Sequence, residues 1–138
     1  MKGIVLVSHG GLAEGMLDAV RMFVGEPEQL AAIGFMPSED IAEFAVRIRQ
    51  AVESVDTGEG VVILCDLLFG SPCNCAAMLL RTEEDAERVQ IVTGANLPMV
   101  IEYVTARDMG MDVEGIIQTG RDGIVDYNEL HRQRAAGA

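Results

Sequence analysis

A histidine followed by two glycines ends the first apolar run of the chain and is well suited to chemistry. His9 comes directly after residues 4–7 and Ser8, and Gly10 and Gly11 precede a helical pattern. Glycine lets a ligand approach the backbone closely, and a helix N-terminus offers unpaired N–H groups that suit an anion. This setting indicates phosphate or carboxylate chemistry, with a simple hydrogen-bonded histidine at a strand end as the alternative.

A carboxylate has the matching place after the third apolar run. Residues 61–65 are typical of a strand buried on both faces, and Asp66 closes it. If Asp66 accepts a hydrogen bond from one ring nitrogen of His9, it fixes the tautomer and leaves the other nitrogen free as a nucleophile. A loop cap is the other role open to Asp66. The charge of Asp66 should raise the pKa of the His9 ring, whereas the helix N-termini should lower it. A net shift in either direction stays open.

The composition excludes several classes of function. The 138 residues carry 10 basic and 22 acidic side chains, with a formal net charge of −12. This charge disfavours nucleic acid and anionic membranes and favours a basic protein partner. Lys2 is the only lysine, so backbone N–H groups, hydroxyls or a partner's cations must stabilise any bound phosphate. Without a run of about 20 apolar residues or a signal-peptide pattern, we expect a cytoplasmic protein.

Three cysteines surround one predicted loop. Cys65, Cys73 and Cys75 are odd in number, which argues against a disulfide framework. A Cys-x-Cys pair near His9 could bind a soft metal, but its spacing matches no common zinc site. We therefore expect no metal and no cofactor, and assign the thiols to apolar packing.

Strand-like and helix-like segments alternate along the first hundred residues. Strand runs occur at 4–7, 30–35, 61–65 and 89–93, and helical spacing occurs at 12–24, 41–55, 73–80 and 98–109. Gly25 is the expected C-cap of the first helix, Ser38 the N-cap of the second, and Ser71 the N-cap of a third that opens with Pro72.

The signal weakens toward the C-terminus. Residues 82–87 read as a charged turn, 113–119 as one or two helical turns, and 123–127 as a short strand. We expect a single domain over residues 1–128 and a loose polar tail over residues 129–138.

The alternation predicts an open three-layer α/β/α fold. Short connections between strands and helices call for a mainly parallel sheet with helices on both faces. In the commonest small version the strand order is 2-1-3-4, and the ligand crevice lies between the carboxyl ends of the first and third strands. His9 and Asp66 end those two strands, so this topology brings them together.

Four motifs at the predicted strand ends resemble one known family. They are Val5 to Gly10, Ala13 to Met16, Asp66 with Gly70-Ser71-Pro72-x-Asn74, and Gly94 to Met99. Together they are similar to the mannose-type enzyme IIA domain (mannose, fructose and sorbose family) of the bacterial phosphoenolpyruvate-dependent sugar phosphotransferase system. The similarity runs from the first residue to about residue 108 and is weaker to residue 127.

The resemblance implies a phosphoryl carrier. In that family, the histidine matching His9 accepts phosphate from phospho-HPr on Nε2 and passes it to a IIB component, which serves the membrane IIC and IID permease. The aspartate matching Asp66 pairs with this histidine. The phosphate- or partner-binding residues that the motifs imply are Gly10, Ser71, Asn74 and Asn96. Family members are homodimers that exchange an antiparallel final strand, for which residues 124–127 are the candidate.

One position departs from the family pattern. Where relatives usually read Asp-Leu-Phe-Gly-Gly-Ser-Pro, this chain has Phe69 in place of the first glycine. If that glycine uses a positive φ, a phenylalanine there is strained and the loop is reshaped. Partner recognition or the class of sugar would then differ. The sequence identifies neither the sugar nor whether IIB is a separate chain.

Other phosphate-handling proteins fit less well. A response-regulator receiver needs an acidic pair after the first strand and a lysine after the fifth. A histidine phosphatase or phosphoglycerate mutase needs Arg-His-Gly, and here Ser8 takes the place of the arginine. Motifs of P-loop nucleotide binders and of Gly-x-Ser-x-Gly hydrolases are absent. A regulatory or degenerate IIA-like module that binds partners without carrying phosphate stays open, as does the phosphotransfer subunit of a dihydroxyacetone kinase.

Overall fold

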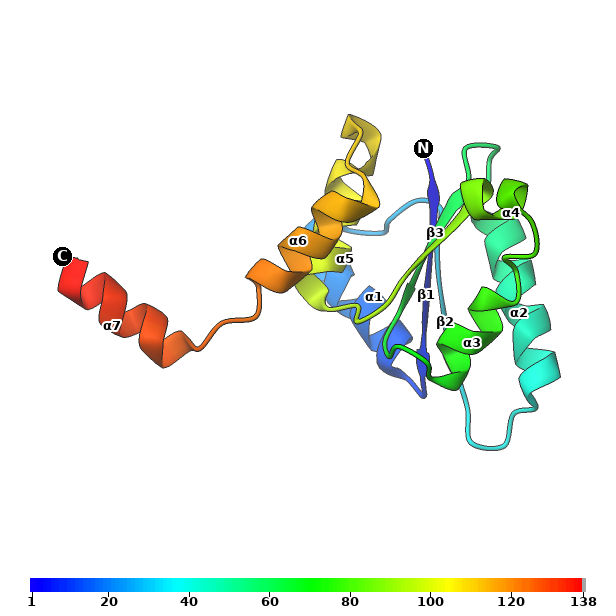
Figure 1. The fold of residues 1–138 in the computed structure, drawn as a ribbon, viewed down its shortest axis with the longest axis horizontal. Coiled ribbons are helices and arrows are strands. Elements are labelled where there is room, and N and C mark those ends of the chain that lie inside the picture. Colours follow the sequence, from blue (N-terminus) through cyan, green and yellow to red (C-terminus); the bar gives the residue numbers. More distant parts are fainter. Residues whose placement is uncertain (138) are drawn as a thin grey trace.

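The computed structural model describes residues 1–137 and has three layers (Figure 1). Its four strands are β1 (Gly3–His9), β2 (Leu30–Phe35), β3 (Val61–Cys65) and β4 (Val89–Val92). All neighbouring pairs are parallel, and the order is β2-β1-β3-β4. The predicted fold class and strand order are thereby confirmed.

Helices cover both faces of the sheet (Figure 1). One face carries α1 (Leu12–Val24), α5 (Leu97–Ala106) and α6 (Val113–Asp122), and the other carries α2 (Ile41–Val55), α3 (Ser71–Ala77) and α4 (Glu83–Arg88). The 3-10 turn η1 (Arg107–Met109) extends α5, and α7 (Tyr127–Gly137) projects away from the three layers. Within residues 1–137, no helix combines the length and apolar character needed to cross a bilayer.

The central strands alternate between two apolar clusters. Val5, Val7 and Ile63 pack with α2 and α3 on one side of the sheet. Their neighbours along the strands, Ile4 and Leu6 among them, pack with α1, α5 and α6 on the other side. Because both faces are covered, the strands read in the sequence as continuous apolar runs.

The three cysteines belong to the first of these clusters. Cys65, Cys73 and Cys75 are free thiols, all buried against α2 and the sheet. Burial, with smaller contributions from Cys73 and Asp66, raises the pKa of the Cys65 thiol to about 12. The Cys65 thiol therefore stays protonated, and the three buried cysteines act as small apolar side chains.

Two segments expected to lack regular structure are helical. Residues 82–87, expected as a turn, mostly belong to α4, because the Thr82 side chain accepts the N–H of Asp85 and the Asp85 side chain accepts the N–H of Thr82. The tail, expected to be loose over residues 129–138, is helical to Gly137 within α7. No residue of α7 is buried, so local contacts such as the Glu129–Arg132 ion pair support it.

Both predicted serine caps are wrong. A turn in which the Glu39 N–H donates to the carbonyl of Met36 follows β2, so α2 starts late and Asp40 takes the N-cap position in place of Ser38. Gly70 is the N-cap of α3, and Ser71 is already its first helical residue. The predicted C-cap at Gly25 is confirmed.

Two helices also end at residues other than those predicted. The third helix ends at Ala77 instead of residue 80, and α6 continues to Asp122, well beyond the expected residue 119. Residues 124–126, expected as part of a strand, lie between α6 and α7 without regular structure. Ile124 is 75% exposed and Val125 is 58% exposed. A strand that pairs only with a second copy cannot form in one chain, so strand exchange stays a prediction.

A buried arginine ties the end of α5 to the start of the sheet. The Arg107 guanidinium donates to the backbone oxygens of Lys2 at 3.0 Å, Gln29 at 3.3 Å and Glu28. Burial lowers its pKa, and the nearby charges of Asp108 and Glu28 partly oppose that shift. This one side chain thus satisfies carbonyl groups from two separate segments that flank β1 and β2.

We expect Arg107→Ala to lower the free energy of unfolding by about 2–4 kcal/mol, because it removes the guanidinium donors from three part-buried carbonyl oxygens and opens a cavity. Urea denaturation of the two proteins measures the change. Arg134→Ala, at an exposed position of α7, is the control and should change the free energy by less than about 0.5 kcal/mol. Equal effects of the two substitutions would contradict this role of Arg107.

Candidate functional site

The carboxyl edge of the sheet brings His9 and Asp66 together, as predicted. Val7 in β1 pairs with Cys65 in β3, so the chain emerges from both strands at the same level. Nδ1 of the His9 ring lies 2.9 Å from Oδ2 of Asp66. The backbone N–H of His9 donates to the same oxygen, also at 2.9 Å. A single carboxylate oxygen therefore fixes both the backbone and the ring of His9.

The charge of Asp66 determines the tautomer of His9. Burial raises the pKa of the Asp66 carboxyl, but the hydrogen bonds from the backbone and ring of His9, with the charge of the imidazole, together lower it below its usual range. An ionised carboxylate can only accept, so the ring proton must sit on Nδ1. The lone pair of the neutral ring then lies on Nε2, where a nucleophile needs it.

The ring and its anchor differ in exposure. The side chain of His9 is 46% exposed, whereas that of Asp66 is 10% exposed. Oδ1 of Asp66 is buried and has no hydrogen-bond partner within residues 1–137, so His9 is the group that balances this carboxylate. A large partner can therefore reach the imidazole while the aspartate stays shielded.

Gly70 packs directly against the His9 ring. A Cβ at this position would lie 2.7 Å from Cε1 and 3.3 Å from Nε2 of His9. Even an alanine would therefore push the ring away from its place beside Asp66. In the sequence, Gly70 is recognisable only as part of a motif. Nothing in a single sequence distinguishes a glycine required by a neighbouring ring from one required by a turn.

Ser8 is a second positioning residue that the sequence analysis missed. Its side chain is buried, accepts the N–H of Ala13 at 2.7 Å and donates to the carbonyl of His9 at 3.0 Å. The N-cap residue Gly11 has no side chain to cap α1, so Ser8 supplies that contact from the end of β1. A hydroxyl beside the histidine in an otherwise apolar strand was the available signal.

Two other predicted site residues, Gly10 and Ser71, lie at the same edge of the sheet as His9. Gly10 takes a left-handed φ of 52°, and its N–H donates to Phe35, so the turn after His9 needs a glycine. Ser71 begins α3 directly after Gly70, and within residues 1–137 its hydroxyl makes no hydrogen bond. The structure thus brings Gly10 and the start of α3 to the His9 edge.

The two asparagines hold the scaffold. Asn74 Nδ2 donates to the carbonyl of Phe69 at 3.2 Å and braces the loop after Asp66. Asn96 caps α5 by accepting the N–H of Met99 at 3.2 Å, and its Nδ2 donates to Gly120 of α6 at 2.9 Å. Their contact with phosphate or a partner stays a prediction. Across residues 1–137, no three potential metal-ligating side chains gather at one place.

Phe69 adopts the left-handed backbone conformation, with φ of 63°. Asn74 holds its carbonyl, and Gly70 N donates to Leu67 O at 3.2 Å, so the loop accepts the strain at Phe69. The Phe69 side chain is nevertheless 77% exposed, beside Leu67 at 56% and Leu68 at 54%. We call these three residues the apolar rim of the site.

We expect Phe69→Gly to stabilise the fold by about 1 kcal/mol, because glycine removes the left-handed strain and the exposed ring contributes little burial. Chemical denaturation measures the difference. Phe69→Ala is the matched control: it removes the ring, keeps a Cβ at the strained position and should change stability by less than about 0.5 kcal/mol. If the glycine and alanine variants unfold at the same urea concentration, the strain assigned to Phe69 is absent.

The chain is similar in sequence to one family of known proteins. Residues 3–119 match the family model EIIA-man, described as the PTS system fructose IIA component. The chain is 32% identical over 139 residues to the PTS system mannose-specific EIIAB component of Escherichia coli K12, covering 98% of this chain and 42% of that protein. It therefore spans less than half of that relative. It is also 37% identical over 100 residues to the PTS system sorbose-specific EIIA component of Klebsiella pneumoniae, covering 72% of this chain and 70% of that protein.

Solved structures share the fold. The PTS IIA protein associated with the fucose utilization operon of Streptococcus pneumoniae has a TM-score of 0.86 and 32% identity, covering 94% of this chain and 95% of that one. Phosphotransferase system component EIIA from Streptococcus agalactiae has a TM-score of 0.83 and 27% identity, covering 94% and 99%.

Proposed function

We propose a function for a chain that belongs to the EIIA-man family of phosphotransferase system (PTS) IIA components, of the mannose, fructose and sorbose type: it carries a phosphoryl group on Nε2 of His9. Phospho-HPr is the donor and a IIB component is the acceptor. The observation that supports this most strongly is the 2.9 Å contact between His9 Nδ1 and the ionised Asp66, which leaves Nε2 as the nucleophile.

The transfer consists of two displacements at phosphorus. In the first, the Nε2 lone pair attacks the phosphoryl group of phospho-HPr, the new N–P bond forms, and the bond to the donor breaks with its electron pair. In the second, a nucleophile of IIB attacks the same phosphorus and the Nε2–P bond breaks, which returns the pair to the ring. The ring keeps its Nδ1 proton throughout, so no proton has to move during either step.

Asp66 stabilises the charge that appears on the ring. As Nε2 bonds to phosphorus, the neutral imidazole becomes an imidazolium whose Nδ1–H points at the carboxylate. This ion pair is stronger in the transition state than in the free protein, and an interaction that strengthens in this way accelerates the reaction. The buried position of Asp66 keeps water from weakening it.

The phosphoryl oxygens need positive charge from elsewhere. Lys2 lies at the opposite end of β1, where its Nζ donates to Gln90 at 2.9 Å. Backbone N–H groups at the turn after His9 and at the start of α3, with the Ser71 hydroxyl, can supply part of the need. A donor or acceptor protein with basic residues would supply the remainder, in keeping with the net charge of −12 on this chain.

The apolar rim favours a protein as the partner of His9. Leu67, Leu68 and Phe69 are each more than half exposed next to an exposed imidazole. Exposed apolar groups that gather around a reactive residue are typical of an interaction surface. HPr and IIB would each cover this rim during transfer.

Incubation with phosphoenolpyruvate, enzyme I and HPr tests the proposal. We expect one acid-labile phosphate, located by mass spectrometry on the peptide that contains His9, and none in His9→Ala. Asp66→Asn should be labelled about 10²–10⁴-fold more slowly, because the amide no longer enforces the Nδ1–H tautomer or balances the imidazolium. His131→Ala, on the projecting helix α7, is the control and should be labelled at the normal rate.

Three results would contradict this function. Labelling that persists in His9→Ala would mean that another residue carries the phosphate. A chain that stays unlabelled would instead support the regulatory IIA-like module that binds partners without carrying phosphate. A labelled chain that passes its phosphate to a dihydroxyacetone kinase and to no IIB component would favour the phosphotransfer subunit of that system.

We also propose that the chain is a homodimer. Within residues 1–137, no strand pairs with the outer edge of β4, and the adjoining hollow is lined by apolar groups that include Ile91, Met99, Ile117 and Ile124. Residues 124–126 are exposed and join α6 to α7, a helix with no buried residue within residues 127–137. Such a segment can complete the sheet of a second copy.

Sedimentation equilibrium tests this assembly. We expect twice the mass of one chain for the unmodified protein, and a single-chain mass for the double variant Ile124→Asp, Val125→Asp, because charges on the exchanged segment cannot be buried without partners. Ala136→Asp, at an exposed position of α7, controls for a general effect of added charge in this region. If the unmodified protein sediments as one chain, the dimer proposal is wrong.

A further inference from the structure

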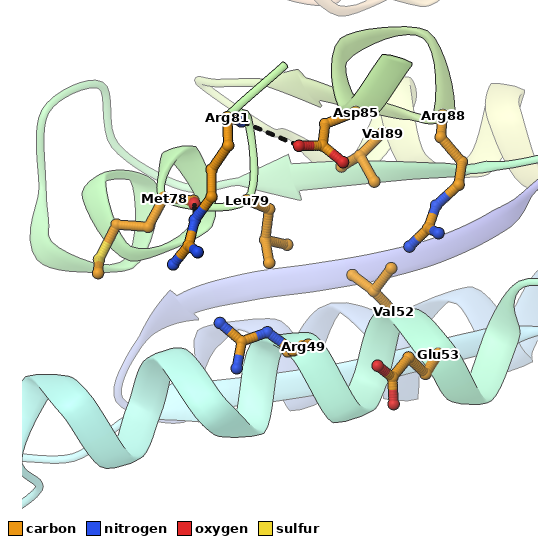
Figure 2. Close-up of a pocket in the computed structure, with 9 residues that line it drawn as sticks. All are labelled: Arg49, Val52, Glu53, Met78, Leu79, Arg81, Asp85, Arg88 and Val89. Atoms are coloured by element: carbon orange, nitrogen blue, oxygen red, sulfur yellow. Dashed lines mark hydrogen bonds between the residues drawn. The ribbon is translucent and has the colours of Figure 1, made fainter. Parts of the chain in front are cut away.

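Three arginines line a hollow on the α2 side of the sheet, outside the His9 site. The hollow has a volume of about 400 Å³ and lies between α2, the segment after α3, and α4 with the start of β4 (Figure 2). Its lining includes the three arginines Arg49, Arg81 and Arg88, the two carboxylates Glu53 and Asp85, and several apolar side chains. None of these residues takes part in the proposed phosphoryl transfer.

The arginines of the hollow have few carboxylate contacts. In the part of the chain that the structure describes, Arg49 makes no ion pair, and Arg81 uses its Nε only for the carbonyl of Met78 at 3.4 Å. Arg88 approaches Asp56 at 3.6 Å and is 58% exposed. By contrast, the ion pairs Arg21–Glu26, Arg47–Glu39 and Arg132–Glu129 are 2.7, 2.6 and 2.5 Å long.

The guanidinium groups converge. In Figure 2, Arg49 from α2 and Arg81 from the opposite side point toward one another across the hollow, and Arg88 reaches in from its other end. Two facing cations repel each other, and an anion between them replaces repulsion with attraction. The chain has 22 acidic side chains, yet within residues 1–137 neither Arg49 nor Arg81 forms an ion pair, which leaves both guanidinium groups available to an external anion.

The two carboxylates of the lining, Asp85 and Glu53, have roles other than pairing with Arg49 or Arg81. Asp85 Oδ2 accepts the backbone N–H groups of Arg81 and Thr82, both at 3.1 Å, so it serves as the cap of α4. This cap also fixes the backbone from which Arg81 extends. Glu53 lies one turn after Arg49 on α2 and makes no ion pair within residues 1–137, which leaves its oxygens free to accept hydrogen bonds from a ligand.

We propose that this hollow binds a small phosphate ester that also carries hydroxyl groups. Guanidinium groups bind phosphate oxygens in pairs, and here Arg49 and Arg81 approach from two sides while Arg88 adds charge. Glu53 accepts hydrogen bonds from the hydroxyl groups, and Val52, Leu79 and Val89 form an apolar floor for the carbon skeleton. Because the arginines are exposed, the affinity is modest and falls with added salt.

Titration of the nitrogen-15-labelled protein tests this site, with glucose 6-phosphate, inorganic phosphate and glucose as probes at constant ionic strength. With glucose 6-phosphate, we expect saturable shifts of the Nε–H signals of Arg49 and Arg81 and of the backbone amide of Thr82. Glucose should cause none, and inorganic phosphate should bind more weakly. Arg49→Gln and Arg81→Gln should each weaken binding of glucose 6-phosphate about tenfold, the usual effect of losing one charge-assisted hydrogen bond.

Matched variants distinguish binding in this hollow from binding at His9 or at exposed arginines in general. Arg132→Gln, on α7, should leave the affinity unchanged, as should His9→Ala at the other site. Loss of binding in His9→Ala would place the ligand at the carboxyl edge and overturn the proposal. So would an affinity that the double variant Arg49→Gln, Arg81→Gln does not reduce, or the lack of any saturable shift with glucose 6-phosphate. Equal binding of inorganic phosphate and glucose 6-phosphate would overturn the assignment to an ester with hydroxyl groups.

Discussion

The two hydrogen bonds that Oδ2 of Asp66 accepts from His9 are the constraint on which this site depends. One comes from the backbone N–H and the other from the ring, each at 2.9 Å. Both exist because β1 and β3 are neighbours in a parallel sheet and end at the same level. The register of the sheet thus sets the tautomer of an exposed imidazole, and the tautomer decides which nitrogen can react. The proposed transfer needs no other group from this chain to move a proton.

The surrounding residues keep this arrangement while leaving the ring open. Ser8 joins the end of β1 to α1 from within the core, and Gly70 leaves room for the ring where any side chain would displace it. On the outer side, the strained Phe69 keeps an aromatic ring exposed beside His9. Strain at an exposed apolar residue does not stabilise the fold, which agrees with the proposal that Phe69 contacts a partner. The site thus holds the imidazole from beneath and leaves its outer side open to the proposed partners.

The sequence was sufficient for the fold and for the pairing of His9 with Asp66, because both follow from patterns that can be recognised without tertiary information. Continuous apolar runs identify buried parallel strands, and the strand order brings His9 to Asp66. The sequence was insufficient where a residue's role depends on a distant neighbour. Nothing local shows that Gly70 lies against a ring, or that Gly70 and not Ser71 caps α3. The helix α7 was missed because it buries no side chain and so lacks apolar periodicity, and α4 was missed because its capping box lies in a charged segment typical of a turn. Residues 124–126 differ from these cases, because a strand that pairs only with a second copy cannot form in a single chain.

In the structure, Asp66 keeps the proton of the neutral His9 ring on Nδ1 and the lone pair on Nε2. The most direct measurement is the nitrogen-15 chemical shifts of the His9 ring in selectively labelled protein at alkaline pH, where the two tautomers give different patterns. We expect a protonated Nδ1 and a bare Nε2 in the unmodified chain, and a shift of the proton toward Nε2 in Asp66→Asn. A proton found mainly on Nε2 of the unmodified chain, or a tautomer ratio that Asp66→Asn leaves unchanged, would contradict it.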